Sequence, residues 1–274
     1  MRAIGLHIRI TSTLTDLITK ALRLQIPLFQ CFFVQQTTGL LLDPDPIDVQ
    51  EFLTVRRAHF NNLYVHGSYW VNLASVTMSN HRILHRELEL AQKLEFTHMI
   101  VHPGSAKGAH DRMEGIDALA RTLNTIARKN YGINIILENT AHGNMAIGSD
   151  ITDFTLLLKK LDNPDAISFC IDTAHAYSYG YDIVDPAGRE AFIQLLDTAI
   201  GLSRIHLLHV NDTHETLGSK LDRHQVIGQG SLGDDTLKAF IQDVRLRTLP
   251  IIMELPPLEE QEEVAILEKV RSWK

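Results

Sequence analysis

Histidine stands out in this chain of 274 residues, which contains 14 of them. It is the commonest metal ligand in proteins and the side chain that changes charge near neutral pH. Many of these histidines lie at the ends of short apolar runs or in the segments after them, and aspartate and glutamate residues occupy equivalent places. The ligand-type residues at these places are His66, His102, Glu138, Asp172, His175, His209, Asp222, His224 and Glu254.

Three carboxylates among them, Glu138, Asp172 and Glu254, directly follow an apolar run. If they converge in a site of low dielectric constant, they repel one another unless they are protonated or share a cation. The neighbouring imidazoles favour zinc or manganese over magnesium or calcium. One zinc ion takes about four or five ligands, so this many candidates suit two or three ions with a carboxylate bridging a pair. A single residue of this kind would more often be a core histidine or a helix cap. Here six of the apolar runs end at or near a potential metal ligand, which predicts a metal site.

The elements that must position these residues alternate regularly along the chain. Short runs rich in Ile, Val and Phe are typical of buried parallel strands, and apolar residues recur at helical spacing between them. The runs cover residues 3–8, 28–34, 63–65, 98–102, 133–138, 167–172, 205–210 and 250–254. Helical patterns cover residues 81–94, 116–127, 156–161, 192–199 and 259–273. Strands that alternate with helices in this way predict a single (β/α)8 TIM barrel across residues 1–274, with the metal site at the C-terminal ends of the strands.

Composition narrows the class of protein further. Hydrophobic residues make up 45% and charged residues 22% of the chain, which excludes a disordered or coiled-coil protein. The net charge of −7 argues against a general-purpose nucleic-acid binder. No apolar run reaches the roughly 18 residues of a membrane helix and the first residues do not form a signal peptide, so we expect an intracellular, cytoplasmic protein with no membrane partner. Cys31 and Cys170 lie in apolar runs and are expected to be buried free thiols.

Six segments carry specific motifs: residues 65–69 (VHGSY), 102–105 (HPGS), 138–141 (ENTA), 171–176 (IDTAHA), 209–212 (HVND) and 222–224 (DRH). Together they resemble the endonuclease IV family, the zinc-dependent apurinic/apyrimidinic (AP) endonucleases of base-excision repair. The resemblance implies three zinc ions per chain, with manganese as an alternative at one site. It assigns one ion to His66, His102 and Glu138. It assigns a second ion to Glu138, Asp172, His209 and Glu254, and a third to His175, Asp222 and His224.

For function, the resemblance implies hydrolysis of the DNA phosphodiester 5′ to an abasic site, which leaves a 3′-hydroxyl and a 5′-deoxyribose phosphate. A metal-bound hydroxide would be the nucleophile, with Glu138 and Glu254 as the catalytic residues. The implied partner is double-stranded DNA containing abasic sites, bound by a monomer that needs no protein partner and associates with the nucleoid. DNA contacts are expected from an aromatic wedge and from two basic side chains on phosphates, which are Tyr69, Trp70, Lys220 and Arg223.

Two loops depart from the family pattern. Family members often have a Ser-Ala-Gly-Gly-like stretch after the first strand, whereas residues 9–13 here read RITST. They usually have an arginine or another long polar side chain after the second strand, where residues 35–39 here read QQTTG, so that Gln35 or Gln36 is the available substitute. The metal ligands are therefore intact, and the loops that bind DNA are altered.

Two short segments have two readings each. Asn211 and Asp212 either orient the metal ligands or form a plain turn. Residues 228–230 (GQG) form either a tight turn or a backbone platform for phosphate.

Two other functions remain open. A xylose-isomerase-like sugar isomerase or epimerase would need only Glu138, Asp172, His209 and Glu254, and would leave the other ligand-type residues without a role. A catalytically silent DNA-lesion-binding protein would keep the fold and lose turnover. Metal stoichiometry distinguishes the first alternative, and incision of DNA distinguishes the second.

Overall fold

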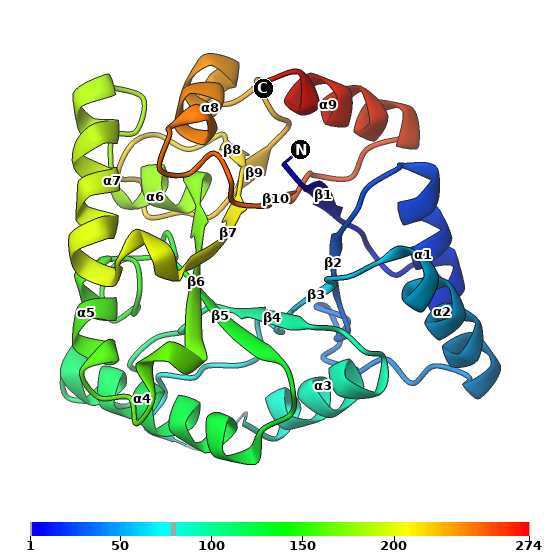
Figure 1. Cartoon of the computed structure of the whole chain (residues 1–274). Helices are drawn as coiled ribbons and strands as arrows, with labels where there is room; N and C mark the ends of the chain where they lie inside the picture. Colours follow the sequence, from blue (N-terminus) through cyan, green and yellow to red (C-terminus); the bar gives the residue numbers. More distant parts are fainter. Residues whose placement is uncertain (1, 78–80, 274) are drawn as a thin grey trace.

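A closed barrel of eight parallel strands forms the centre of the molecule, in the order β1-β10-β7-β6-β5-β4-β3-β2 (Figure 1). The structure is a computed structural model that describes residues 2–77 and 81–273. The barrel strands are β1 (Ile4–His7), β2 (Phe29–Phe32), β3 (Tyr64–His66), β4 (His98–Val101), β5 (Asn134–Glu138), β6 (Ile167–Asp172), β7 (Ile205–His209) and β10 (Ile251–Met253). Each overlaps one of the eight predicted runs, so the predicted (β/α)8 barrel is confirmed. Met1, residues 78–80 and Lys274, which the predicted domain of residues 1–274 includes, lie outside the described residues.

Helices cover the outside of the barrel (Figure 1). Those in the described residues are α1 (Leu14–Arg23), α2 (Pro46–His59), α3 (His81–Lys93), α4 (Arg112–Lys129), α5 (Thr152–Leu158), α6 (Thr173–Tyr179), α7 (Pro186–Ile200), α8 (Gly233–Gln242) and α9 (Glu260–Ser272). Polar residues fix where helices begin and end. Asp111 begins α4 by accepting a hydrogen bond from the backbone N of Glu114 at 3.0 Å, and Asn130 ends it in the left-handed region with φ 48°. None of the described helices is both long and apolar enough to cross a membrane.

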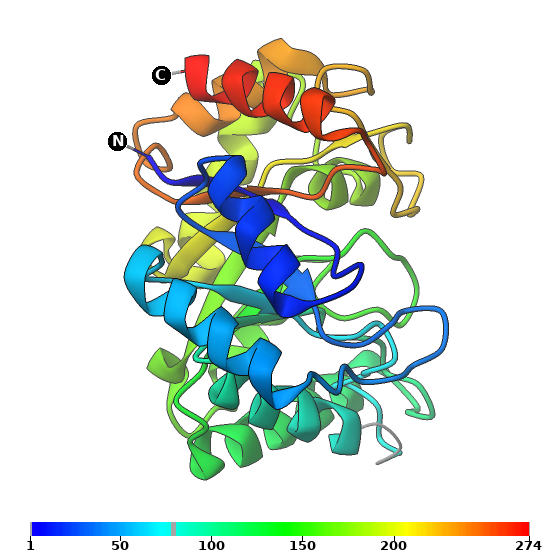
Figure 2. The same ribbon diagram turned by 90° about the vertical axis from the view of Figure 1, so that its right-hand side faces the viewer.

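The long connections gather at one end of the barrel. The segments after β2, β4 and β5 cover residues 33–45, 102–111 and 139–151, whereas those before β3, β4 and β5 cover only 60–63, 94–97 and 130–133. Figure 2 shows these long loops on one side of the barrel. A small antiparallel hairpin, β8 (Asp212–Thr213) with β9 (His224–Gln225), also stands at this end and was not predicted from the sequence. The C-terminal ends of the strands are therefore surrounded by loops that can bind a ligand.

Two successive layers of side chains lie inside the barrel toward the C-terminal ends of its strands. A lower apolar layer forms its own cluster, separate from the core between strands and helices, and consists of Leu28, Tyr64, Ile100, Ile136, Cys170, Leu207 and Ile252. Residues two positions further along a strand point to the same side. The next inward layer is therefore Gln30, His66, His102, Glu138, Asp172, His209 and Glu254, every one of them polar. On six strands, a ligand-type residue follows a residue of the lower layer by two positions. This explains why these six ligand-type residues lie at one level.

Both cysteines are buried and free, as expected from the sequence. Cys170 belongs to the lower layer inside the barrel, and Cys31 packs in the core outside it. Burial raises the pKa of the Cys170 thiol to about 12.

Candidate metal centre

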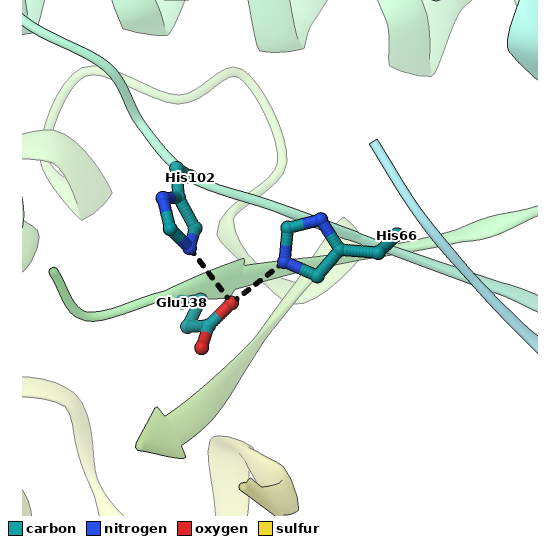
Figure 3. Close-up of side chains that lie close together, drawn as sticks. All are labelled: His66, His102 and Glu138. Carbon is teal, nitrogen blue, oxygen red and sulfur yellow. Dashed lines mark hydrogen bonds and ion pairs between the residues drawn. The ribbon is translucent and has the colours of Figure 1, made fainter. Parts of the chain in front are cut away.

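Glu138 lies at the centre of the polar layer. Its Oε2 atom lies 3.0 Å from His66 Nε2 and 3.1 Å from His102 Nε2 (Figure 3). Its Oε1 atom lies 2.8 Å from His209 Nδ1. The ligand atoms of His66, His102 and Glu138 all lie within 4.8 Å of one another, so these three residues, which end β3, follow β4 and end β5, could hold one ion.

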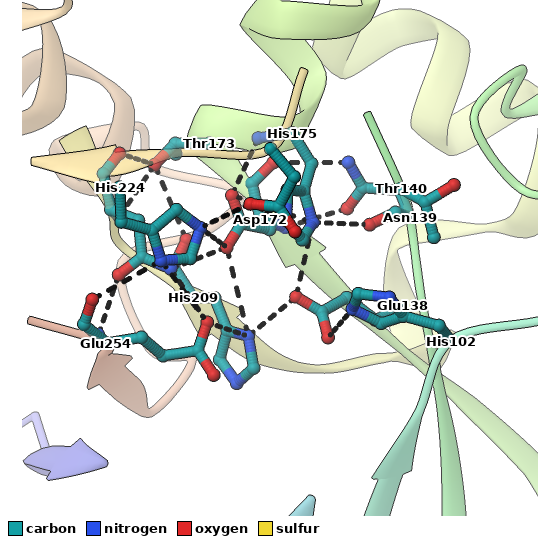
Figure 4. A network of polar contacts seen from close by, with 12 residues as sticks. His102, Glu138, Asn139, Thr140, Asp172, Thr173, His175, His209, His224 and Glu254 are labelled. Carbon is teal, nitrogen blue, oxygen red and sulfur yellow. Dashed lines mark hydrogen bonds and ion pairs between the residues drawn. The ribbon is translucent and has the colours of Figure 1, made fainter. Parts of the chain in front are cut away.

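A second set shares Glu138 and lies on the opposite side of it. Ligand atoms of Glu138, Asp172, His209 and Glu254 also fall within 4.8 Å of one another (Figure 4). His209 Nδ1 lies 3.4 Å from Glu254 Oε2 and 3.9 Å from Asp172 Oδ2. Because Glu138 belongs to both sets, it is placed to bridge two ions.

The third set joins α6 to the hairpin. Asp222 Oδ1 lies 3.1 Å from His175 Nε2 and 3.4 Å from His224 Nε2. Asp172 lies close by as well, since its ligand atom falls within 4.8 Å of those of His175 and His224. Asp172 also begins α6, where its Oδ1 accepts a hydrogen bond from His175 N at 2.8 Å, so it is both a helix cap and a candidate ligand.

The chemistry of these donors fits transition-metal cations. Nε2 of His175 and Nε2 of His224 are buried, and within the described residues neither meets the full geometry of a hydrogen bond, although Asp222 Oδ1 lies 3.1 and 3.4 Å away. A buried nitrogen without a hydrogen bond is costly, and a cation would satisfy both. Imidazole nitrogens mixed with carboxylate oxygens are the donor set that zinc takes. The structure brings all nine predicted ligand residues into one continuous cluster at the C-terminal ends of the strands.

Without a cation, the cluster is balanced by protons on its histidines. Burial alone would raise the pKa of Glu138, but the imidazoles of His209 and His102 hold it well below its usual value. Burial alone would lower the pKa of His175, but the carboxylates of Asp172 and Asp222 raise it well above its usual value. Bound cations would replace these protons, so we expect metal uptake to release protons.

Asn211 holds two of the carboxylates in place. Its Nδ2 donates to Asp172 Oδ2 at 2.6 Å and to Glu254 Oε2 at 3.0 Å. Its Oδ1 accepts a hydrogen bond from the backbone N of Glu254 at 2.7 Å. Of the two readings of this residue, the structure supports the one in which it orients ligands.

Asp212 organises the loop that follows the hairpin. Its buried carboxylate accepts hydrogen bonds from the backbone N atoms of Gly228 and Gly230, both at 3.0 Å, and from those of Leu232 and Gly233. Because the N–H groups of residues 228 and 230 are used within the protein, the structure supports a tight turn at residues 228–230. The phosphate-platform reading of this segment was wrong.

Tyr69 lies between two cavities beside the cluster. The larger one, about 870 Å³, includes His7, Glu254 and residues of the loops after β1 and β2, and the smaller one, about 690 Å³, includes His102 and residues of the loops after β3, β4 and β5. Tyr69 lines both and is 59% exposed, with its ring 5.7 Å from that of His102. Gln36 holds the neighbouring backbone, because its Oε1 accepts from Tyr69 N and its carbonyl accepts from Trp70 Nε1, both at 3.1 Å.

The remaining residues expected to contact DNA are engaged in the protein to different degrees. Trp70 is 48% exposed beside Tyr69. Lys220 places its ammonium 3.4 Å from the centre of the Tyr179 ring and donates to the Tyr179 carbonyl. Arg223 lies 3.5 Å from a carboxylate oxygen of Glu215 with its side chain mostly exposed. Gln36 is occupied with the Tyr69 loop, and Gln35 accepts a hydrogen bond from Thr38.

Sequence reasoning missed two polar residues beside the cluster, the buried Gln30 and the partly buried His7. Gln30 Nε2 lies 2.7 Å from Glu254 Oε1 and 2.9 Å from His7 Nδ1. The available signal was a glutamine in the middle of an apolar strand run, at the position equivalent to the ligands on the neighbouring strands.

Comparison with known proteins gives first the class and then the family. The family model described as "Xylose isomerase-like TIM barrel" matches residues 21–273. A protein from Thermoplasma acidophilum named "Probable endonuclease 4" is 35% identical over 260 residues, which is 92% of this chain and 88% of the relative. Another from Thermoplasma volcanium with the same name is 36% identical over 219 residues, covering 77% of this chain and 75% of the relative.

Among solved structures, endonuclease IV from Thermus thermophilus aligns with a TM-score of 0.82 and 27% identity, covering 99% of this chain and 98% of that one. D-psicose 3-epimerase aligns with a TM-score of 0.70 at 11% identity over 98% of both chains, which is a likeness of fold alone. This chain belongs to the endonuclease IV family of xylose isomerase-like TIM barrels, as the sequence motifs predicted.

Proposed function

We propose that this chain is a zinc-dependent AP endonuclease of base-excision repair. It would hydrolyse the phosphodiester 5′ to an abasic site in double-stranded DNA and leave a 3′-hydroxyl and a 5′-deoxyribose phosphate. The observation that carries the proposal is the convergence of nine ligand-type side chains in three adjacent sets, the first two of which share Glu138. The endonuclease names of its relatives support the same activity.

Three zinc ions per chain suit the three sets, with manganese as an alternative at one of them. His66, His102 and Glu138 would hold the first. Glu138, Asp172, His209 and Glu254 would hold the second, and His175, Asp222 and His224 the third. Zinc supplies a Lewis acid that lowers the pKa of water toward neutrality and stabilises the charge of a phosphate under attack.

The two proposed catalytic carboxylates have different surroundings and therefore different tasks. Glu138 is fully buried and both its oxygens face histidines, so it holds the cluster together. The Glu254 side chain is 14% exposed and lines the larger cavity, while Asn211 and Gln30 fix its two oxygens. Burial alone would raise the pKa of Glu254, but His209 beside it keeps it well below its usual value, so the carboxylate is ionised. Glu254 is therefore placed to orient the attacking water by accepting its hydrogen bond.

DNA would lie across the loops at the C-terminal ends of the strands. Tyr69, exposed between the two cavities, would enter the duplex at the abasic site, with Trp70 beside it. Lys220 and Arg223 would contact phosphates at the rim. We further propose that the protein acts as a monomer on chromosomal DNA inside the cell.

The test is incision of a duplex oligonucleotide that bears one tetrahydrofuran abasic analogue, with the product ends analysed. Zinc-loaded protein should cut 5′ to the lesion and leave a 3′-hydroxyl. The Glu138→Ala variant, purified identically, should lose at least about 10³-fold in rate because the shared ligand is gone. The same rate in both preparations would indicate a contaminating nuclease, and absence of incision at low salt would contradict the proposal.

One observation favours a second candidate function, that of a sugar isomerase or epimerase. Glu138, Asp172, His209 and Glu254 form a complete ligand set by themselves, as a sugar isomerase or epimerase with one metal site would need. Three zinc ions per chain with no turnover of ketose sugars would exclude that enzyme. Tight binding of abasic DNA without incision would instead indicate a catalytically silent lesion-binding protein.

A further inference from the structure

Gln30 is the fully buried member of the polar layer that cannot serve as a strong metal ligand. It lies on β2, and its side chain reaches across the barrel to His209 on β7 and to Glu254 after β10. We propose that Gln30 is a positioning residue that makes His209 a metal ligand through Nδ1 and couples it to Glu254. This inference deepens the proposed function, because it rests on the metal site described above.

The hydrogen bonds around Gln30 allow only one orientation of its amide. A Glu254 carboxylate oxygen lies 2.7 Å from one amide position and can only accept, so the NH₂ group must occupy that position. The second N–H of this group donates to His7 Nδ1 at 2.9 Å. The carbonyl Oε1 therefore faces His209 Nε2, at 2.9 Å.

The amide orientation determines which nitrogen of His209 keeps its proton when a cation binds to the ring. Gln30 Oε1 can only accept, so His209 Nε2 must be the donor and keep its proton. Nδ1 lies 2.8 Å from Glu138 Oε1 and 3.4 Å from Glu254 Oε2, so it is the nitrogen that faces the other ligands of the second set and would give up its proton to a cation. The same amide holds Glu254 from the other side, so one side chain orients two ligands of the second set.

Two substitutions separate these two tasks. Gln30→Met removes all three side-chain hydrogen bonds with little change in volume, and Gln30→Glu keeps an acceptor for His209 while it removes the donor to Glu254 and His7. Gln35→Met is the matched control, since Gln35 is an exposed glutamine five positions further along whose side-chain oxygen accepts from Thr38. Thermal unfolding of the metal-free proteins checks that each variant folds.

The first readout is zinc affinity, measured by competition with a chromophoric chelator. We expect the weakest-bound zinc of wild type to lose about 10- to 100-fold in affinity in both Gln30 variants and to be unchanged in Gln35→Met. Equal affinities in wild type and both Gln30 variants would overturn the coupling to Glu254.

The second readout is the long-range ¹⁵N–¹H spectrum of the histidine side chains, with His209 assigned through its backbone. Wild type and Gln30→Glu should show a protected Nε2–H on His209, and Gln30→Met should lose this protection. A proton on Nδ1 in the zinc-loaded wild type, or the same spectrum in all variants, would overturn the proposal. If the wild type takes up no zinc, the proposed function fails, and protection of the His209 Nε2–H in the metal-free wild type, with its loss in Gln30→Met, still decides whether Gln30 holds this ring.

Discussion

Two regions around the candidate metal centre are built in different ways. On the side of β3 to β7 and β10, the residues that face the centre are buried and bonded to one another, as the Glu138, His209 and Asn211 contacts show. On the side of the loops after β1 and β2, residues 9–13 and 35–40 are mostly exposed, and Gln36 is their main link to the Tyr69 loop. The first side derives its geometry from strand register, and the second from short loop contacts.

Under the proposed function, this difference separates the side that would perform the chemistry from the side that would bind DNA. Inward-pointing residues of parallel strands cannot change without disturbing the whole barrel, whereas surface loops tolerate substitution. None of the nine candidate ligands lies in the loops at residues 9–13 and 35–39. We expect substitutions on the ligand side to change metal affinity and stability, and substitutions on the loop side to change DNA affinity alone.

The largest effect should be the change with pH in the stability of the metal-free protein. It arises from the buried histidines and carboxylates of the candidate metal centre. The raised pKa values of His175 and His209 stabilise the fold below their unfolded value of about 6.5, and this contribution is lost as pH rises through the folded values. The lowered pKa values of Glu138 and Glu254 stabilise it above about 4.3, and that contribution is lost as pH falls through the folded values. Metal-free protein should thus be most stable between about pH 4.5 and 6.5.

Thermal unfolding from pH 4 to 9, with and without zinc, measures this effect. Each pKa unit contributes about 1.4 kcal/mol, or roughly 2–5 °C of Tm for a chain of this size, so the metal-free Tm should fall by several degrees between pH 6 and pH 9. Zinc-loaded protein is the matched control and should gain stability over the same interval, because ligation needs deprotonated imidazoles. A metal-free Tm that rises toward pH 9 would show that the histidines are not charged in the fold.

Asn211→Ala should have the next largest effect. It removes the donor to Asp172 and Glu254, and we expect zinc affinity to fall about 10- to 100-fold with a matching loss of incision at limiting zinc. Asn72→Ala is the control, since Asn72 bonds the backbone of Ser105 and contacts no ligand carboxylate in the described residues. Chelator competition measures both, and equal affinities would mean that strand geometry alone orients the carboxylates.

The ligand side could be predicted from the sequence because its residues end or follow strand runs, and the C-terminal ends of barrel strands meet at one face. The structure adds that Glu138 and Glu254 follow Ile136 and Ile252 of the lower layer by two positions and so point to the same side. Gln30 was missed because one uncharged residue in an apolar run carries no charge pattern. The contacts of Asp212 were missed because its partners are backbone N–H groups 16 to 21 residues further along. The strands of the β8–β9 hairpin have only two residues each, too few for a periodic pattern.

Tyr69 lies between the metal ligands and the loops, and Tyr69→Ala tests whether it contributes to DNA binding without affecting metal binding. The ring of Tyr69 packs against those of Phe32 and His66, with centroids 5.4 and 5.8 Å away, while the residue stays largely exposed. Loss of one stacking ring costs about 1–3 kcal/mol, so affinity for the abasic duplex should fall roughly tenfold while zinc content is unchanged. Fluorescence anisotropy with abasic and undamaged duplexes measures this, and Tyr69→Phe should behave as wild type. An equal loss on undamaged DNA would show that Tyr69 does not read the lesion.

The smallest effect should come from Arg9, which tests whether the altered loops still contribute charge. Arg9 is exposed at the larger cavity together with Gln35 and Gln36, and in the part of the chain that the structure describes it belongs to no ion pair. If it contacts one phosphate, Arg9→Gln should weaken binding a few-fold and reduce the slope of log K against log salt by about 0.9. Arg247→Gln, an exposed arginine just before β10 at the opposite end of the barrel, should leave both unchanged. An unchanged slope for Arg9→Gln would mean that Arg9 does not contact a DNA phosphate. The affinity for DNA would then depend on the metal cluster and the Tyr69 loop.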